Sequence, residues 1–261
     1  AMVDTSNGLY EGYKDFLIEK RDDGVVIGTM NRPERLNALG GGVRPSIRRF
    51  IQEVGQDPEA RVLVFTGAGR AFCSGADLSS SGAGGQESEW PTGPFESRFA
   101  WCLDLLALNK PTIAAINGPA VGGGLGLALL CDIRIVSDRS RLIPIWLKRG
   151  IRSGDFVTWT LPRLIGYSRA LKYLYLADDI PLDEAERIGL VDQVVAHEQF
   201  WGEVMSLASR LAKGPPIHMG LVKQAVMKGL YLDPWEAAMM EQWAGSKTAG
   251  LEDSEGGRGA F

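Results

Sequence analysis

The chain has 261 residues, of which 45% are hydrophobic and 23% charged, and its formal net charge is −4. This composition excludes a disordered or fibrous chain, and the slight excess of acidic residues gives no electrostatic footprint for nucleic acid. With only two histidines, His197 and His218, a polyhistidine metal site is excluded as well.

The three cysteines, Cys73, Cys102 and Cys131, form no Cys-x-x-Cys pair. An odd number of widely spaced thiols argues against a disulfide framework or a zinc ribbon, so we expect reduced and packed side chains. The N-terminal segment holds charges such as Asp4 and Lys14 and no long apolar run. We therefore expect a cytoplasmic protein without a secretory signal.

The predicted elements begin with a β-hairpin. Residues 16–20 and 25–30 form apolar strands on either side of Asp22-Asp23-Gly24, which is a turn sequence. Apolar spacing then predicts a helix over 43–54 and a short buried strand over 62–66. The next elements are a Ser/Gly-rich loop over 79–86 and a helix over 95–108.

The segment from Thr112 to Cys131 carries no charge and has the length of a membrane span. It is interrupted by Asn117-Gly118-Pro119 and by three consecutive glycines, and such a break would leave backbone groups unpaired in lipid. We therefore interpret the segment as a buried strand over 112–116, a turn, and a buried helix over 123–130.

A further strand over 133–136 continues an alternation of short apolar strands and helices, which is typical of a largely parallel sheet covered by helices. From Asp155 onward the pattern is nearly all helical, apart from a brief strand at 189–191. The sequence thus predicts an α/β core over residues 1–195 and a C-terminal helical region over residues 196–261.

Glycine accounts for 33 residues, and the three glycines at 122–124 open the helix that follows strand 112–116. The first amides of a helix have no internal partner, so a ligand carbonyl can approach them closely where no β-carbon intervenes. A second loop, residues 71–78, also follows a strand and could supply the other half of an oxyanion hole. The alternative is that these glycines only allow tight packing of helix and sheet. Their spacing misses the dinucleotide-binding fingerprint, which argues against a nucleotide redox enzyme.

The motifs with most information, in chain order, are NRPERLNAL (31–39), AFCSGADL (71–78), KPTIAAINGPAVGGG (110–124), Cys131-Asp132, LPRLIG (161–166) and AERIGLV (185–191). Together they resemble the crotonase (enoyl-CoA hydratase/isomerase) superfamily. The resemblance implies a spiral of ββα units with C-terminal helices that build a homotrimer or a dimer of trimers. It also implies an acyl-CoA substrate without a separate cofactor, and it places the two oxyanion-hole amides at Ala76 and Gly123.

By the same resemblance, the coenzyme A moiety contacts mostly backbone atoms of two segments. The residues assigned to substrate binding are Arg35, Leu36, Ser74, Asp77, Leu78, Gly122 and Trp146. For Asp77 the alternative is a role in bracing its turn. Lys110 is a weaker candidate for contact with the CoA phosphates, and a solvated surface charge is its alternative.

The chain departs from the family's hydratases at both acid/base glutamates, because Gly126 and Trp146 stand at those places. Neither side chain can carry a proton in catalysis, so the usual pair is missing. Asp155 is the candidate substitute, since some family members place a working aspartate at or next to this turn. Its alternative role is that of a helix N-cap.

We therefore predict an acyl-CoA enzyme of the enoyl-CoA hydratase/isomerase type whose reaction is atypical and uses Asp155, with Trp146 shaping the acyl pocket. Two alternatives stay open: a thioester hydrolase, isomerase or dehalogenase that uses the same aspartate, and a non-catalytic acyl-CoA-binding subunit. The dehalogenase alternative lacks its histidine, because the predicted helix over 95–108 contains none. Weaker site candidates are Asp104, Glu96 and Cys73.

Overall fold

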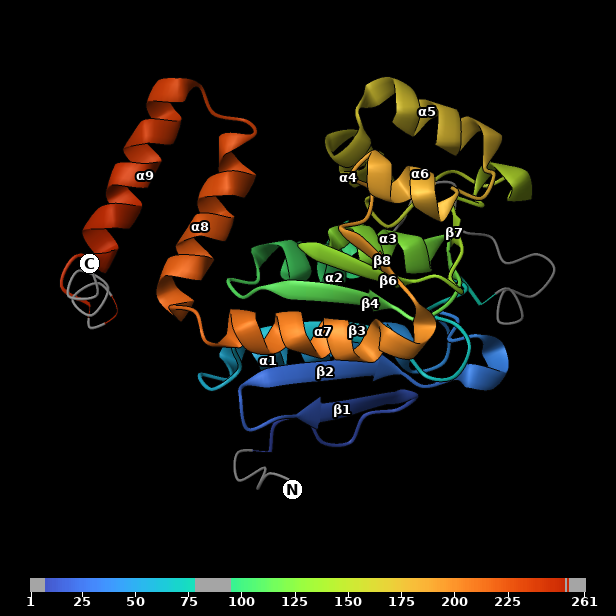
Figure 1. The fold of residues 1–261 in the computed structure, drawn as a ribbon, viewed down its shortest axis with the longest axis horizontal. Coiled ribbons are helices and arrows are strands. Elements are labelled where there is room, and N and C mark those ends of the chain that lie inside the picture. The colour runs from blue at the N-terminus through green and yellow to red at the C-terminus, as the bar shows by residue number, and fades with distance from the viewer. Residues whose placement is uncertain (1–7, 78–94, 252, 254–261) are drawn as a thin grey trace.

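The computed structural model describes residues 8–77, 95–251 and 253, and its centre is a six-stranded sheet (Figure 1). In spatial order the strands are β1 (Phe16–Lys20), β2 (Val25–Met30), β3 (Val62–Gly67), β4 (Thr112–Ile116), β6 (Ile133–Ser137) and β8 (Gln193–Val195). The first two strands pair antiparallel, and every later pair in this sheet is parallel. The loops that follow β3 and β4 therefore leave the sheet at the same edge.

The predicted hairpin and the buried strands after it are confirmed, whereas the strand predicted at 189–191 is wrong. Gly189 has φ +76°, and the Leu190 amide donates back to the Ala185 carbonyl at 2.8 Å. These residues therefore close a turn after a helix, and the strand begins later, at Gln193. The loop predicted at 79–86 lies outside the described residues.

Helices cover both faces of the sheet. On one face lies α7 (His197–Ala212), whose apolar side chains pack against the strands. The opposite face is covered by the larger apolar cluster. Two helices, α1 (Val43–Gln56) and α3 (Gly123–Leu130), contribute most of their buried residues to it. The remaining helical elements of the body are η1 (Pro33–Arg35), α2 (Phe95–Ala107), η2 (Leu147–Arg149), α4 (Val157–Ile165), α5 (Tyr167–Leu176) and α6 (Leu182–Arg187).

A second, two-stranded parallel sheet consists of β5 (Ala120–Val121) and β7 (Leu142–Ile143). β5 follows β4 after a tight turn at Asn117-Gly118-Pro119, whose Asn117 side chain donates to the Gly67 carbonyl at 2.8 Å. This hydrogen bond links the turn to the last residue of β3, so the loops that follow β3 and β4 lie side by side.

The last two helices, α8 (Pro216–Gly229) and α9 (Pro234–Thr248), project from the body as an arm (Figure 1). At its tip Tyr231 stacks on Trp159 of α4, with ring centroids 6.3 Å apart, and the Arg163 guanidinium lies over both rings. Along the described parts of the chain, none of the helices combines the length and the apolar character needed to cross a bilayer.

Candidate active site

The two glycine-bearing loops lie against each other at the carboxyl edge of the sheet. Cys73 forms an isolated parallel bridge with Ala120, and the Val121 amide donates to the Cys73 carbonyl at 2.9 Å. A β-carbon placed on Gly75 would come within 3.1 Å of the Gly123 nitrogen. The loop that carries Ala76 and the start of α3 are thus immediate neighbours, as the oxyanion-hole hypothesis requires.

The start of α3 leaves amides without internal partners. Gly122 precedes the helix with φ +52°, a conformation that favours glycine, and its carbonyl accepts from the Gly126 amide at 2.9 Å. Within the described ranges, the amides of Ala76 and Gly123 donate no hydrogen bond. Both N–H groups therefore have the capacity to bind an external oxygen.

Close packing accounts for another glycine of this loop. A β-carbon on Gly124 would lie 2.2 Å from the Cys73 carbonyl oxygen and 2.6 Å from the Cys73 β-carbon. No side chain fits there, because real contacts between carbon atoms begin at about 3.5 Å. Gly124 is therefore needed for tight packing, which is the alternative that the sequence left open for these glycines. The amide of the neighbouring Gly123 is nevertheless unpaired among the described residues.

Asp155 lies against the same helix, on the turn that leads into α4. A β-carbon on Gly123 would meet the Asp155 Oδ2 atom at 2.8 Å, and one on Gly126 would meet the Asp155 β-carbon at 2.8 Å and its carbonyl oxygen at 2.9 Å. Asp155 therefore occupies the space into which a side chain at position 126 would extend. Its carboxylate is brought next to Gly123 from more than thirty residues farther along the chain.

The helix-cap interpretation of Asp155 is wrong in this structure. The N-cap residue of α4 is Phe156, and no side-chain cap hydrogen bond is formed. Asp155 and Phe156 have φ +51° and +59°, so two consecutive residues other than glycine adopt the left-handed conformation. Aspartate tolerates this region better than most residues, whereas a bulky aromatic residue there is strained. The turn thus holds Asp155 in an unusual backbone conformation and keeps it out of the capping position.

One arginine that the sequence analysis missed faces this carboxylate. Arg44, at the start of α1, donates from Nη1 to the Asp155 Oδ1 atom at 3.1 Å. The two residues are 111 positions apart, and no motif or periodicity marks the arginine as part of a site. Only the fold brings the pair together, so no signal in a single sequence could have identified it.

Trp146 is 4% exposed and belongs to the apolar cluster on this side of the sheet. It directly precedes η2, and its carbonyl accepts from the Arg149 and Ile151 amides. The indole is therefore a fixed apolar side chain rather than a solvent-exposed one. Two arginines that follow it in the chain, Arg149 and Arg152, are exposed.

Three of the residues predicted to contact coenzyme A lie together. The Ser74 amide donates to the Leu36 carbonyl at 2.9 Å, and the Ser74 hydroxyl donates to the Arg35 carbonyl at 3.3 Å. Arg35 itself is exposed. These contacts place segment 35–36 next to segment 74–76, which carries the Ala76 amide. Leu78 lies outside the described residues.

Asp77 braces the same loop from the other side. Its Oδ2 atom accepts from Arg32 Nη1 at 2.8 Å, and its side chain is only 8% exposed. A β-carbon on Gly40 would collide with this carboxylate. The bracing alternative for Asp77 therefore has direct structural support, and the ion pair fixes the backbone that follows Ala76.

The weaker candidates have other partners. Burial raises the pKa of the Cys73 thiol to about 12, which makes it a poor nucleophile at neutral pH. Asp104 accepts from Arg48 at 3.0 Å and from Gln52 at 2.9 Å. Lys110 donates to the backbone carbonyls of Val54 and Asp57 at the end of α1, so it is neither a phosphate contact nor a solvated charge here. The side chain of Glu96 lies outside the described residues.

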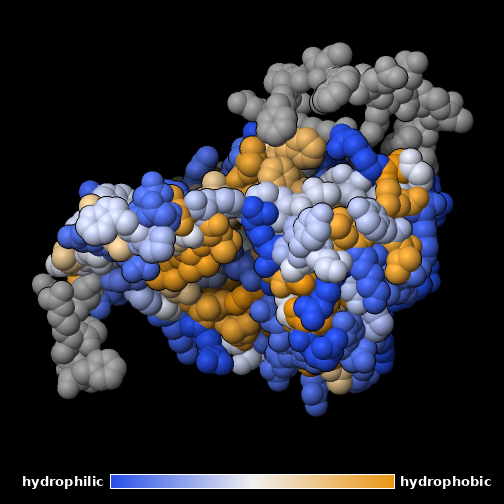
Figure 2. Space-filling model, turned by 90° about the horizontal axis from the view of Figure 1, so that it is seen from above, coloured by the Kyte–Doolittle hydropathy of each residue, from blue (hydrophilic) through white to orange (hydrophobic). Residues whose placement is uncertain are grey.

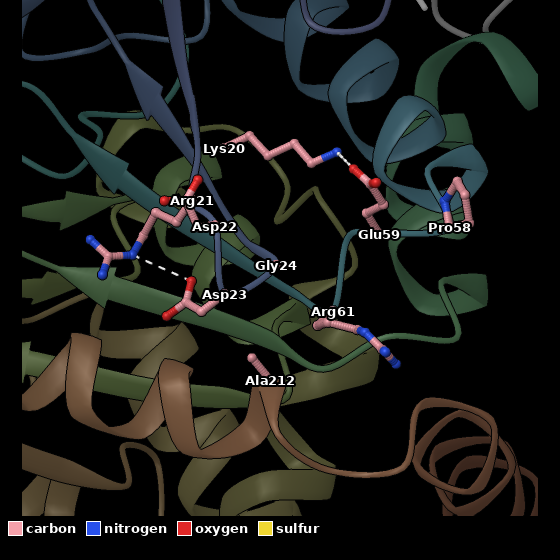
Figure 3. A pocket seen from close by; sticks show the side chains of 9 residues that line it. All are labelled: Lys20, Arg21, Asp22, Asp23, Gly24, Pro58, Glu59, Arg61 and Ala212. Carbon is pink, nitrogen blue, oxygen red and sulfur yellow. Dashed lines mark hydrogen bonds and ion pairs between the residues drawn. The ribbon is translucent and has the colours of Figure 1, made fainter. Parts of the chain in front are cut away.

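A cavity of about 540 Å³ opens at the opposite edge of the sheet, next to the β1–β2 turn and the end of α7 (Figure 3). Four of the charged residues that line it form two ion pairs: Lys20 with Glu59 at 2.6 Å, and Arg21 with Asp23 at 3.5 Å. It lies at the amino ends of β2 and β3, far from the glycine loops, whereas open α/β sheets bind ligands at the carboxyl ends of their strands. The glycine loops, at the carboxyl ends of β3 and β4, are therefore a better candidate for the active site than this cavity. In the described ranges, no cluster of three or more His, Cys, Asp or Glu residues could hold a metal ion.

The chain is similar to known proteins over most of its length. Residues 20–261 match the family model described as "Enoyl-CoA hydratase/isomerase". The chain is 35% identical over 235 residues to "Probable enoyl-CoA hydratase EchA12" of Mycobacterium tuberculosis, covering 88% of this chain and 82% of that protein. It is 34% identical over 218 residues to "4-chlorobenzoyl coenzyme A dehalogenase-1" of Arthrobacter sp, covering 79% and 76%. A solved structure titled "putative enoyl-CoA hydratase from Streptomyces coelicolor A3(2)" superposes with a TM-score of 0.87 at 28% identity, covering 96% of this chain and 92% of that one.

Proposed function

Because this chain belongs to the enoyl-CoA hydratase/isomerase family, we propose that the amides of Ala76 and Gly123 hold the thioester oxygen of an acyl-CoA while Asp155 acts on its acyl carbons. The α/β crotonase fold with C-terminal helices, expected from the sequence, is confirmed by the solved relatives. One observation carries the proposal: the Asp155 carboxylate is packed against Gly123, the residue whose amide is unpaired among the described residues.

The proposed chemistry begins with the thioester carbonyl between the two amides. Asp155 removes a proton from the α-carbon, and the electron pair of the broken C–H bond moves onto the carbonyl oxygen to form an enolate. Two fixed N–H donors stabilise this negative charge, and the loss of one such donor typically lowers a rate by about 10²–10³-fold. Asp155 is then a neutral acid that can return the proton to the same carbon or to another one.

A single carboxylate favours a proton shift over hydration. Hydration requires one group to activate water and another to protonate the α-carbon, and in this chain Gly126 and Trp146 replace the two glutamates that do so in the family's hydratases. In a proton shift, the same carboxylate takes the proton and gives it back, so no second group is needed. We therefore propose isomerisation of an unsaturated acyl-CoA as the reaction class.

A second candidate is substitution on a halogenated aryl-CoA ring. Asp155 would attack the ring carbon and form an aryl ester as the halide leaves, and water would then hydrolyse the ester to a hydroxyaryl-CoA and the free carboxylate. The observation that favours it is the similarity to a protein named 4-chlorobenzoyl coenzyme A dehalogenase. Aromatic residues flank Asp155: the Phe156 ring lies 5.7 Å from that of Phe99 and 6.4 Å from that of Trp159. Against it stands the absence of histidine from residues 95–108.

We also propose that the chain assembles as a homotrimer or a dimer of trimers through its C-terminal arm. In the described part of the arm, large apolar side chains are exposed rather than packed: Ile217, Val222, Val226, Leu230, Trp235, Met239 and Trp243. Figure 2 shows hydrophobic surface where the arm leaves the body. Exposed apolar surface of this extent is typical of an association face, and a second copy of the chain is the occupant that the family resemblance implies.

The test of the reaction uses butanoyl-CoA and but-3-enoyl-CoA in D₂O, with deuterium incorporation followed by mass spectrometry. Wild-type protein should exchange α-hydrogens of butanoyl-CoA and convert but-3-enoyl-CoA to the 2-enoyl isomer. Asp155→Asn should lower both rates by at least about 100-fold, because a general acid–base group typically contributes about 10²–10⁴-fold to a rate. Asparagine is chosen because it keeps the shape and also tolerates the left-handed backbone. Asp104→Asn, on the surface between α1 and α2, is the matched control and should leave both rates unchanged.

Three outcomes would overturn parts of the proposal. Hydration of crotonyl-CoA at the rate of an ordinary hydratase would refute the altered chemistry. Tight binding of every thioester without exchange or turnover would identify a non-catalytic subunit. A bound [1-¹³C]butanoyl-CoA whose carbonyl stretch in difference infrared spectra equals that of the free thioester would refute the oxyanion hole, since two donors must lower it.

A further inference from the structure

Arg44 contacts the candidate carboxylate from α1. It is the second residue of α1, and its Nη1 atom donates to the Asp155 Oδ1 atom at 3.1 Å. The arginine side chain is 36% exposed and that of Asp155 is 15% exposed, so the pair is only partly shielded from water. The guanidinium carbon lies 6.0 Å from the ring centroid of Trp101, a nearly buried side chain of α2.

The remaining sides of Asp155 face α3. Its β-carbon and carbonyl oxygen lie against Gly126, and its Oδ2 atom lies against Gly123. One carboxylate oxygen is therefore engaged by the arginine, while the other is turned toward the residue with the unpaired amide. Among the contacts of the described residues, no other cation pairs with this carboxylate.

We infer that Arg44 is a positioning residue, which holds Asp155 so that Oδ2 faces the thioester bound at Gly123. The inference rests on the proposed function, in which Asp155 acts on the acyl carbons. A charge-assisted hydrogen bond to one oxygen of a carboxylate fixes its rotation about the Cβ–Cγ bond. Without it the carboxylate can turn, and a misplacement of about 1 Å can lower a rate by about 10²-fold.

The chain contains a matched control for this ion pair. Arg48, one turn later on α1, donates to Asp104 at 3.0 Å, with side chains that are 45% and 29% exposed. The two pairs have the same chemistry, the same helix and nearly the same distance, and both tie α1 to another element. Only the Arg44 pair includes the candidate carboxylate, so any purely structural effect should be common to both.

The experiment compares Arg44→Gln, Arg44→Lys and Arg48→Gln with wild-type protein. The readouts are α-hydrogen exchange of saturating butanoyl-CoA in D₂O, its dissociation constant by calorimetry, and the melting temperature. We expect Arg44→Gln to lower the exchange rate by about 10- to 100-fold with a dissociation constant within about twofold of wild type. Arg44→Lys should recover part of that loss. Arg48→Gln should leave exchange unchanged, while both glutamine variants lower the melting temperature to a similar extent.

Equal exchange by Arg44→Gln and Arg48→Gln would overturn the inference, as would a loss explained entirely by weaker thioester binding. If wild-type protein binds butanoyl-CoA but exchanges nothing, the proposed function fails by itself. Crystal structures of the two glutamine variants then decide the role of Arg44. A carboxylate that turns or becomes disordered only in Arg44→Gln supports the positioning role, and an Asp155 side chain that keeps its place in both variants refutes it.

Discussion

Substitution of Gly126 by alanine tests whether Asp155 and position 126 compete for one space. The new β-carbon would lie 2.8 Å from the Asp155 β-carbon and 2.9 Å from the Asp155 carbonyl oxygen. Carbon–carbon contacts are favourable from about 3.5 Å, so the overlap is about 0.7 Å. Both opposing atoms belong to or adjoin the backbone, and they cannot move aside as the end of a long side chain would.

The expected loss of stability follows from two opposing contributions. Overpacking of this kind costs about 1–3 kcal/mol, whereas replacing glycine by alanine inside a helix returns about 0.5–1 kcal/mol. The net result is a decrease of about 0–2.5 kcal/mol in the free energy of unfolding. For a chain of this size, each kcal/mol corresponds to about 2–4 °C in melting temperature. The control is Gly202→Ala on α7, where nothing lies within 4 Å of the new β-carbon and stability should rise.

The same substitution should affect the reaction, because relief of the overlap moves the turn that carries Asp155. We expect Gly126→Ala to exchange butanoyl-CoA hydrogens about tenfold more slowly, while Gly202→Ala exchanges normally. Gly126→Glu should lower stability further and should not create crotonyl-CoA hydration, since the added side chain has to displace Asp155. Calorimetric melting and mass-spectrometric exchange are the assays. A Gly126→Ala protein as stable and as active as Gly202→Ala would refute the reasoning.

Three further predictions concern other parts of the molecule. Gly124→Ala should prevent stable folding, because its β-carbon would lie 2.2 Å from the Cys73 carbonyl oxygen; a normal melting curve would contradict this. Burial raises the pKa of the Cys73 thiol from 9.0 to about 12. The buried neutral thiol therefore makes its full contribution to the free energy of unfolding below pH 9, and this contribution is lost as the pH rises from 9 to 12, where the thiol ionises more easily in the unfolded chain. Urea titrations should show a shallower alkaline decline for Cys73→Ala than for wild type. Light scattering should give the mass of three or six chains, and Val226→Glu on the exposed face of α8 should lower it; a monomeric wild-type protein would refute the assembly.

The elements that could be predicted from the sequence are those whose signal is local. The uncharged run from Thr112 to Cys131 predicted a strand, a turn and a helix, because buried elements need apolar residues and a turn needs Asn-Gly-Pro chemistry. The strand expected at 189–191 was wrong, because a buried Leu190 satisfies the same apolar pattern from within a turn. A run of apolar residues therefore predicts burial more directly than it predicts strand geometry.

The candidate site could be predicted only where its residues lie within a motif. Ala76 and Gly123 were identifiable because each follows a strand in a segment that resembles a known family. The sequence identified Asp155 as a candidate, but it did not identify the contacts of its side chain. The helix cap that was its alternative role is not formed. Arg44 was not identifiable at all, because its partner is 111 residues away and the contact exists only in the folded chain.

The family resemblance places Gly126 and Trp146 at the positions of the two hydratase glutamates. Under the proposed function, this replacement and the presence of Asp155 are best understood as one structural change rather than as a loss followed by a compensation. A side chain at position 126 and the Asp155 turn as it stands compete for the same space, since the first β-carbon already overlaps the turn and forces it to move. The turn itself requires two residues in the left-handed conformation, a strain that persists only where surrounding contacts hold it. Those contacts are the glycine face of α3 and the Arg44 ion pair. Under the proposed function, this chain presents a carboxylate from the turn before α4 in place of one from α3. A relative that carries glutamate at the position of Gly126 should therefore have a different conformation in that turn.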